Sequence, residues 1–243
     1  MKRDVATIPL NAEEELVIAT DNSGAIGMHE QDEVHVPYDV VAYYNFRVAW
    51  MECVAAGAEP FSVVIHNFSG DEAWEQLLAG IHRGVKELAI PNLEITGSTE
   101  TNFQLLQSAI GMAIIGKRHK KKRQTSLRKY DPEKMEAAVI GKPLVGNEVI
   151  KNPQSVAPLS LFKWLARQHG VISLLPVGSK GILYELGQLF SRQALEFSVD
   201  LPMTKTSGPA TCFIAVYEKA VATKVQEKSG SLFHPVKIKR AVD

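Results

Sequence analysis

The segment KRHKKKRQTSLRK at residues 117–129 constrains the fold more than any other stretch of this sequence. Eight of its thirteen residues are Lys or Arg. Because a buried charge must be paired, a run of this density cannot enter a hydrophobic core. The run therefore predicts a basic linker between two lobes, residues 1–116 and 130–243. We favour this interpretation over a nucleic-acid-binding patch, because no aromatic residues are interleaved with the basic ones.

The sign of the charge changes at the same border. Residues 1–116 hold 17 acidic and 5 basic residues, a net charge of −12, and residues 117–243 hold 10 acidic and 22 basic residues, a net charge of +12. The formal charge of the whole chain is therefore zero, which gives no overall attraction to nucleic acid. With 243 residues, 45% of them hydrophobic, the chain can build a sizeable buried core.

Several protein classes are excluded by short features of the sequence. Cys53 and Cys212 are the two cysteines, too few for a disulfide framework or a four-cysteine zinc site, which indicates a reducing compartment. The first residues, MKRDVATIPLNAEEE, become acidic before an apolar region forms, so they do not make a signal peptide. The apolar run at 109–115 is too short to span a membrane. We expect a cytoplasmic protein without a membrane segment.

Strands and helices are expected to alternate in both lobes. In the first lobe, apolar patterns predict strands at 15–20, 33–37, 61–66 and 107–116, and helices at 38–57 and about 72–89. In the second lobe they predict short strands within 138–150, a helix at about 158–169, a strand at 171–177, a helix opened by residues 178–181, and later strands at 196–202, 211–217 and 232–240. The fold class is therefore α/β or α+β with two lobes.

Three polar clusters in the first lobe are the candidate chemistry. Asp21-Asn22-Ser23-Gly24 follows a predicted strand, where a carboxylate could hold a divalent ion, although the same residues make an ordinary turn. Glu52 lies on a predicted helix that ends in a small-residue segment, and it could equally be an exposed helical glutamate. Thr96-Gly97-Ser98-Thr99-Glu100 is a hydroxyl-rich segment suited to phosphate and magnesium, or a solvated loop. No residue identifies a general base, although His66 and Asp71 lie in a plausible loop, HNFSGD.

The order and spacing of these clusters resemble a known superfamily. ATDNSGAIG (19–27), MECVAAGAEP (51–60) and ITGSTETN (95–102) are similar to the ATP-binding half of the superfamily of aminoimidazole ribonucleotide synthetase, thiamine monophosphate kinase, selenophosphate synthetase and HypE. AVIGKPLVGNEVI (138–150) and PVGSKGILYELGQLF (176–190) are similar to its second domain. The chain departs from the pattern where Glu52 and Ser98 replace Asp residues and where Ser-Lys-Gly (179–181) replaces an Asp-Gly-Gly-like element. The short, divergent subgroup that phosphorylates α-ribazole in cobamide lower-ligand salvage is the most similar one.

The resemblance implies a two-lobed PurM-like fold whose N-terminal lobe forms a homodimer through a β-barrel-like interface. It implies ATP and Mg²⁺ as cofactors and a small nucleoside-like alcohol as phosphoryl acceptor. The implied metal ligands are Asp21, Glu52 and Glu100, and the implied ATP contacts come from Asn22, Ser23, Gly24, Thr96, Gly97, Ser98 and Thr99. Lys180, at a predicted helix start, would offset developing negative charge, although a lysine there is as readily a surface residue.

Three alternatives remain open at this point. The chain could be an ATP-dependent cyclising ligase like aminoimidazole ribonucleotide synthetase, or an enzyme like thiamine monophosphate kinase. The replaced Asp residues could instead mark a non-catalytic nucleotide sensor or maturation protein. A nucleic-acid binder that uses residues 117–129 is the least favoured.

Overall fold

The computed structural model of the chain describes residues 5–91, 93–120, 130–190 and 194–240. These residues form two compact units, and the division falls between residues 123 and 124. Each unit contains one five-stranded sheet with its own helices. Within the described ranges, no helix is long and apolar enough to cross a membrane.

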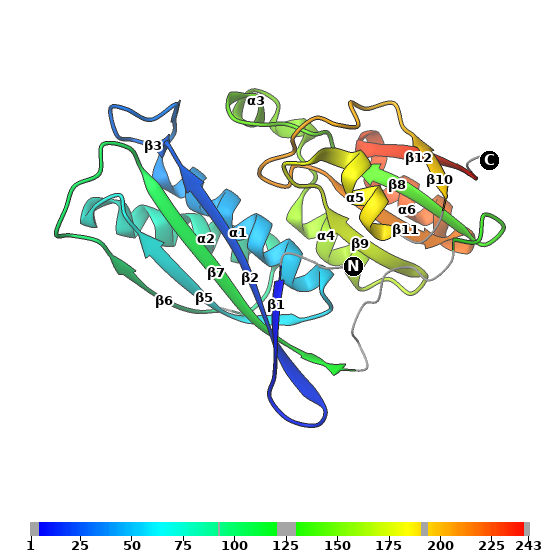
Figure 1. Cartoon of the computed structure of the whole chain (residues 1–243), viewed down its shortest axis with the longest axis horizontal. Coiled ribbons are helices and arrows are strands. Elements are labelled where there is room, and N and C mark those ends of the chain that lie inside the picture. Colours follow the sequence, from blue (N-terminus) through cyan, green and yellow to red (C-terminus); the bar gives the residue numbers. More distant parts are fainter. Residues whose placement is uncertain (1–4, 92, 121–129, 191–193, 241–243) are drawn as a thin grey trace. The chain divides into compact units, whose positions relative to one another are not determined.

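The N-terminal unit is a sheet covered by helices on one face (Figure 1). The strand order is β1-β2-β7-β5-β6, with bounds Val5–Pro9, Glu14–Gly24, Ala109–His119, Glu59–Asn67 and Glu94–Thr99. The helices α1, Tyr38–Ala55, and α2, Trp74–Leu88, pack together on that face, and the 3₁₀ turn η1, Asp71–Ala73, precedes α2. Two short strands, β3 at Ile26–Gly27 and β4 at Val34–His35, pair in the loop between β2 and α1. Neighbouring strands of the main sheet are antiparallel except β5 and β6, which are parallel.

The alternation of residues along the strands decides which face is buried. In β2, Glu15, Val17 and Ala19 are buried beneath α1, and the residues between them are more exposed. Ile110, Met112 and Ile114 of β7 are buried on the same face. The opposite face, which we call the outer face, carries the alternate residues of each strand.

Three segments of this unit differ from the sequence-based expectation. The strand expected at 15–20 continues to Gly24, so the cluster 21–24 lies in β2 and not in a turn. Residues 96–99 belong to β6 and not to a solvated loop. The basic run begins inside the unit, because residues 117–119 end β7 and the Arg118 side chain is buried beside Glu15. Cross-strand pairing explains all three, since partner strands override the turn preference of small polar residues. Residues 121–129 lie outside the described part of the chain.

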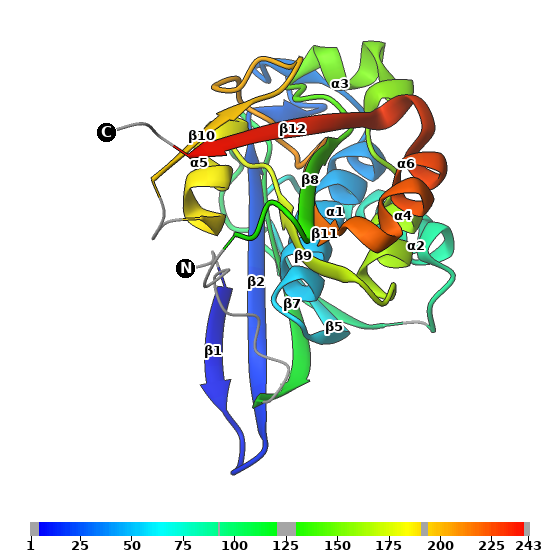
Figure 2. The same cartoon turned by 90° about the vertical axis from the view of Figure 1, so that its right-hand side faces the viewer.

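The C-terminal unit is a sheet with helices on both faces. Its strand order is β10-β12-β8-β11-β9, with bounds Leu195–Ser198, Phe233–Arg240, Met135–Ile140, Phe213–Glu218 and Val171–Pro176, and every neighbouring pair is antiparallel. Helix α5, Gly181–Leu189, covers one face, while α4, Leu159–Ala166, and α6, Ala222–Ser229, cover the other (Figure 2). Ile214 and Val216 face α5. On the other face, the ring centres of Phe213 and of Phe162 from α4 lie 4.9 Å apart.

The fold class predicted from the sequence is confirmed in both units. Most predicted strands and helices are present within a few residues of their expected bounds. The structure adds β1, β6, the five-residue α3 at Asn147–Lys151, and α6, which the apolar pattern did not predict.

Candidate functional site

The register of the N-terminal sheet brings two of the predicted clusters to the same level of the sheet. Asn22 of β2 pairs with Gly111 of β7, Gly111 pairs with His66 of β5, and His66 pairs with Ser98 of β6. The rows on either side run from Asp21 to Gly97 and from Ser23 to Thr99. Residues about 75 positions apart in sequence therefore lie across four adjacent strands.

Strand alternation divides these clusters between the two faces of the sheet. Asp21 and Ser23 point toward α1, where the buried Asn45 donates a hydrogen bond from Nδ2 to Ser23 Oγ at 3.3 Å. Asn22 and Gly24 are exposed on the outer face. The same division places Gly97 and Thr99 on the helix-covered face, with Thr96 and Ser98 exposed on the outer face.

Asp21 is the most electrostatically unusual residue of the group. Burial raises the pKa of its carboxyl from 3.8 to about 7, and a hydrogen bond from the backbone N–H of Asn22 opposes this shift more weakly. Among the described residues, no basic side chain contributes to the shift. The charged carboxylate therefore has no positive side chain to stabilise it among the described residues, and a bound cation would supply that positive charge.

The hydroxyl of Thr99 already accepts a hydrogen bond from within the unit. Asn67, buried at the end of β5, donates from Nδ2 to Thr99 Oγ1 at 3.2 Å and to the carbonyl of Gly70 at 2.8 Å. Its Oδ1 accepts the backbone N–H of Ser69 at 2.9 Å. This network fixes the turn that leaves β5, so Thr99 is better explained as a structural residue than as a ligand contact.

Glu100 also has a structural role. Its Oε1 accepts the backbone N–H of Asn102 at 2.6 Å, and its own N–H bonds the carbonyl of Asn67 at 2.8 Å. The Asn102 N–H is the main cause that lowers the pKa of the Glu100 carboxyl. The carboxylate thus closes the turn that follows β6.

Glu52 lies on the sheet-facing side of α1 but away from Ser23. It follows Asn45 by seven residues, which places it on the same helix face about 10 Å further along the axis. Within the described part of the chain, no group of three or more His, Cys, Asp or Glu side chains is placed to hold a metal ion. The structure joins Asn45 to Ser23, which shares a face of β2 with Asp21, but among the described residues it does not gather Asp21, Glu52 and Glu100 into one cluster.

Gly97 is required by close packing. A methyl group at this position would lie 2.3 Å from the carbonyl oxygen of Ile65 and 3.0 Å from Cη2 of Trp74. Gly97→Ala should therefore lower the free energy of unfolding by about 1–3 kcal/mol. Gly24→Ala is the matched control, because a methyl there meets nothing within 4 Å. Urea denaturation checks this, and equal midpoints for the two variants would contradict the packing argument.

A buried network around Asp32 was missed by sequence reasoning. Asp32 Oδ1 accepts the backbone N–H of Ser108 at 2.7 Å, and Oδ2 accepts the Ser108 hydroxyl at 2.6 Å and the His29 N–H at 2.9 Å. Tyr38 OH and Ser108 Oγ are 2.9 Å apart. The network ties the loop after β2 to the start of β7. Asp32 and Ser108 are 76 positions apart, and no local pattern links them.

In the C-terminal unit, Lys180 directly precedes α5, as its sequence predicts. Its ammonium group donates to the Tyr184 hydroxyl at 3.3 Å and lies 4.4 Å from the centre of that ring. Strands β8 and β9 both pair antiparallel with β11, so their carboxyl ends reach the same edge of the sheet. Lys142 follows β8 and Lys180 follows β9, so both lysines come from loops at this edge.

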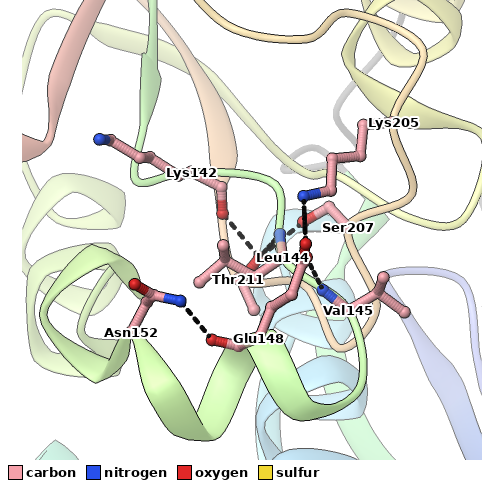
Figure 3. Close-up of polar contacts among 8 residues, drawn as sticks. All are labelled: Lys142, Leu144, Val145, Glu148, Asn152, Lys205, Ser207 and Thr211. Atoms are coloured by element: carbon pink, nitrogen blue, oxygen red, sulfur yellow. Dashed lines mark hydrogen bonds and ion pairs between the residues drawn. The ribbon is translucent and has the colours of Figure 1, made fainter.

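The loops at this edge are joined by the polar cluster of Figure 3. The buried Thr211 hydroxyl donates to the carbonyl of Lys142 at 2.8 Å and accepts the Leu144 N–H at 3.0 Å, with Ser207 Oγ at 2.9 Å. Nearby, Lys205 Nζ pairs with Glu148 at 2.8 Å, and this pairing is the main cause that lowers the pKa of the Glu148 carboxyl. The cluster fixes the backbone from which Lys142 projects.

The fold has relatives among solved structures. PurL from T. maritima, complexed with ADP, matches with a TM-score of 0.64 at 13% identity, over 99% of this chain and 42% of the PurL chain. Thiamine monophosphate kinase from Aquifex aeolicus matches with a TM-score of 0.65 at 11% identity, over 98% of this chain and 89% of that one. A chain of the HypE–HypF complex matches with a TM-score of 0.60 at 14% identity, over 97% and 87%. The chain has the PurM-like fold.

The PurM-like fold that the sequence resemblance implied is confirmed, and its β-barrel-like dimer interface stays a prediction. The likeness lies in the backbone, since the identities are 11–14% for these three structures. This chain spans 42% of the PurL chain that it matches. Sequence comparison with known protein families gives no match, and comparison with curated proteins gives none either.

Proposed function

We propose that this protein binds ATP and transfers its terminal phosphoryl group to the hydroxyl of a small, nucleoside-like acceptor. The observation that carries the proposal is the position of Asp21, a part-buried carboxyl without a basic partner among the described residues, at a level of the sheet lined by polar residues of β2, β5 and β6. In the same fold, PurL from T. maritima has been solved with ADP, AMPPCP and ATP. Phosphoryl transfer needs positioned charge neutralisation more than covalent chemistry, so no nucleophilic side chain is required.

Asp21 fits a magnesium ion. Mg²⁺ usually binds proteins through one or two carboxylates and completes its shell with phosphate oxygens and water. When bound, it would neutralise the phosphate charge that develops during transfer. Asp21 would hold the ion, and Glu52 is the second ligand proposed from the sequence. Glu100 would first have to release the Asn102 N–H that it accepts.

The acceptor is proposed to bind at the edge of the C-terminal sheet where β8 and β9 end. Lys142 and Lys180 bring positive charge to this edge, since Lys142 follows β8 and Lys180 directly precedes α5. Lys180 would need to leave the Tyr184 ring to offset charge on a substrate. From the sequence resemblance, α-ribazole is the proposed acceptor, in cobamide lower-ligand salvage.

Three further candidates remain, and a specific observation favours two of them. An activity like that of thiamine monophosphate kinase is favoured by the 89% of that enzyme's chain that the match covers. A synthetase reaction like that of aminoimidazole ribonucleotide synthetase would use the same ATP site with a different acceptor. A non-catalytic ATP-binding sensor or maturation protein is favoured by the lack of a three-residue metal cluster among the described residues.

We also propose that two copies associate through the end of the outer face formed by β1 and the first half of β2, away from Asn22. Ile8 of β1 is 46% exposed there, Leu16 of β2 lies opposite it, and Ile18 of β2 pairs with Ile115 of β7 in the adjoining row. Covering this apolar area with a second copy would remove it from water. Sedimentation velocity of the full chain tests the homodimer, and a monomer at micromolar concentration would contradict it.

The phosphoryl-transfer proposal is tested with ADP release and thermal shift. The full chain is incubated with Mg-ATP and, separately, α-ribazole, thiamine monophosphate or formylglycinamidine ribonucleotide. A true acceptor should accelerate ADP release, and ligands of the folded protein should raise its melting temperature by mass action. Stabilisation by ATP without acceptor-dependent ADP release across the panel would favour the sensor. No stabilisation by Mg-ATP would contradict every ATP-dependent candidate.

A further inference from the structure

His66 stands on the outer face of the N-terminal sheet with its ring over a glycine. A Cβ built on Gly111 would lie 3.5 Å from Cβ and 3.8 Å from Cδ2 of His66, so the imidazole leans across β7 where that strand has no side chain. The residue is exposed. Among the described residues, its ring has no hydrogen-bond or ion-pair partner.

The two polar neighbours of His66 in its row also have side chains that are open to a ligand. Asn22 and Ser98 are both exposed, and in the described structure neither side chain has a hydrogen-bond partner. Ser98 lies one strand from His66, a spacing of about 4.8 Å, while Asn22 lies two strands away across Gly111. An imidazole, a hydroxyl and an amide therefore form one row of possible N–H and O–H donors.

The charge of the row favours an anion. The row contains no carboxylate, and Asp21, the acidic residue next to it, faces the opposite side of the sheet. The adjoining row on the outer face runs from Thr20 to Thr96 and adds two exposed hydroxyl groups. Several N–H and O–H donors without an acid between them match the oxygens of a phosphate group, which accepts hydrogen bonds at each oxygen.

We infer that His66, Ser98 and Asn22 form a phosphate-binding row, and that His66 contacts the phosphate oxygens directly. The inference goes beyond the magnesium site proposed at Asp21, because that carboxyl faces the other side of the sheet, and it concerns a residue that the sequence resemblance did not assign to ATP. Phosphate oxygens can also come from a phosphorylated acceptor or from free phosphate. The test therefore separates these sources.

The experiment uses the full chain labelled with ¹³C-histidine and titrated with ADP, with ribose 5-phosphate and with inorganic phosphate, without added magnesium. His66→Ala identifies the His66 ring signal. His82→Ala is the matched control, because His82 is exposed on α2 in the other layer of the same unit. We expect ADP to shift the His66 signal, and His66→Ala to weaken ADP binding about tenfold while His82→Ala leaves it unchanged. Ser98→Ala should weaken binding in the same direction.

The possible outcomes are decisive. If ADP binds the parent chain and His66→Ala equally and the His66 signal stays fixed, the inference is wrong and the proposed ATP site still stands. If ADP does not bind without magnesium, the two other ligands test the phosphate-binding row, and the thermal shift with Mg-ATP tests the proposed function separately. A shift of His66 with ribose 5-phosphate or inorganic phosphate would then support a phosphate site, and no shift would overturn it. Circular dichroism of each variant shows that the fold is kept.

Discussion

Asp21→Asn should abolish magnesium-dependent ATP turnover and, at pH 8, make the folded protein more stable. Asparagine is nearly isosteric with aspartate, but it cannot supply the negative charge that a cation and its phosphates require. We expect ADP release to fall by at least about a hundredfold, which is the loss that follows when a positioned electrostatic group is removed. Turnover at the parent rate would show that Asp21 has no role in the reaction.

The gain in stability follows from the sign of the pKa shift. Burial raises the pKa of Asp21 in the folded state to about 7, while the unfolded chain keeps about 3.8. The unfolded state therefore releases its proton first, and the parent chain loses stability as pH rises from about 4 to about 7. The cost above pH 7 corresponds to about 2–4 kcal/mol. Asparagine avoids this cost, so the difference between variant and parent should be largest at pH 8 and near zero at pH 3.5.

The measurement is urea denaturation of the full chain at several pH values, without added divalent metal. Glu75→Gln is the control, since Glu75 is an exposed carboxylate on α2. A stability difference for Asp21→Asn that does not depend on pH would contradict the electrostatic explanation. Glu52→Gln, measured for ADP release beside it, tests the second ligand proposed from the sequence and should lower turnover in the same direction.

The sequence predicts the elements of this fold better than it predicts how their residues face. Apolar runs such as residues 61–66 are confirmed as strands because burial on one face enforces alternation. Residues 21–24 were expected to form a turn, because Asn, Ser and Gly favour turns in isolation. Pairing with residues 109–112 of β7 holds them in β2 instead. That difference places Asp21 and Asn22 on opposite faces of the sheet.

The other features that the sequence does not predict arise from contacts between residues that are far apart along the chain. The Asp32 carboxylate finds its donors on Ser108, and no spacing rule in the sequence joins the two. His66 ends the strand predicted at 61–66 and lies on β5, but its place beside Ser98 depends on the parallel pairing of β5 and β6, which the sequence does not predict. The basic run shows the same effect, because Arg118 is buried through a partner 103 positions earlier.

Arg118→Ala should cause the largest loss of stability of the substitutions considered for this protein. Arg118 of β7 lies directly opposite Glu15 of β2, with Nε 2.7 Å and a terminal guanidinium nitrogen 2.6 Å from Glu15 Oε1. Both side chains are almost fully buried, at 5% and 7% exposure. The guanidinium also donates to the carbonyl of Ala56, just after α1. Removing the arginine leaves a buried carboxylate and a carbonyl unsatisfied, which should cost about 3–5 kcal/mol.

The neighbouring ion pair provides a matched control. Lys117 Nζ lies 3.0 Å from Glu14 Oε1 on the same two strands, but this pair is exposed to water. Lys117→Ala should therefore change the denaturation midpoint little, because solvent screens exposed ion pairs. Trp50 and Trp74 belong to the N-terminal unit, so tryptophan fluorescence in a Trp164→Phe background reports the unfolding of that unit.

A double variant separates the buried charge from simple loss of packing. Glu15→Leu combined with Arg118→Met removes both charges and keeps apolar volume between β2, β7 and the end of α1. If the cost of Arg118→Ala comes from the uncompensated Glu15 carboxylate, the double variant should recover most of the lost stability. If instead Arg118→Ala and Lys117→Ala shift the midpoint equally, the Glu15–Arg118 pair does not hold the strands and the helix end together as its burial indicates. The basic run would then be solvated from its first residue, as its composition alone predicts.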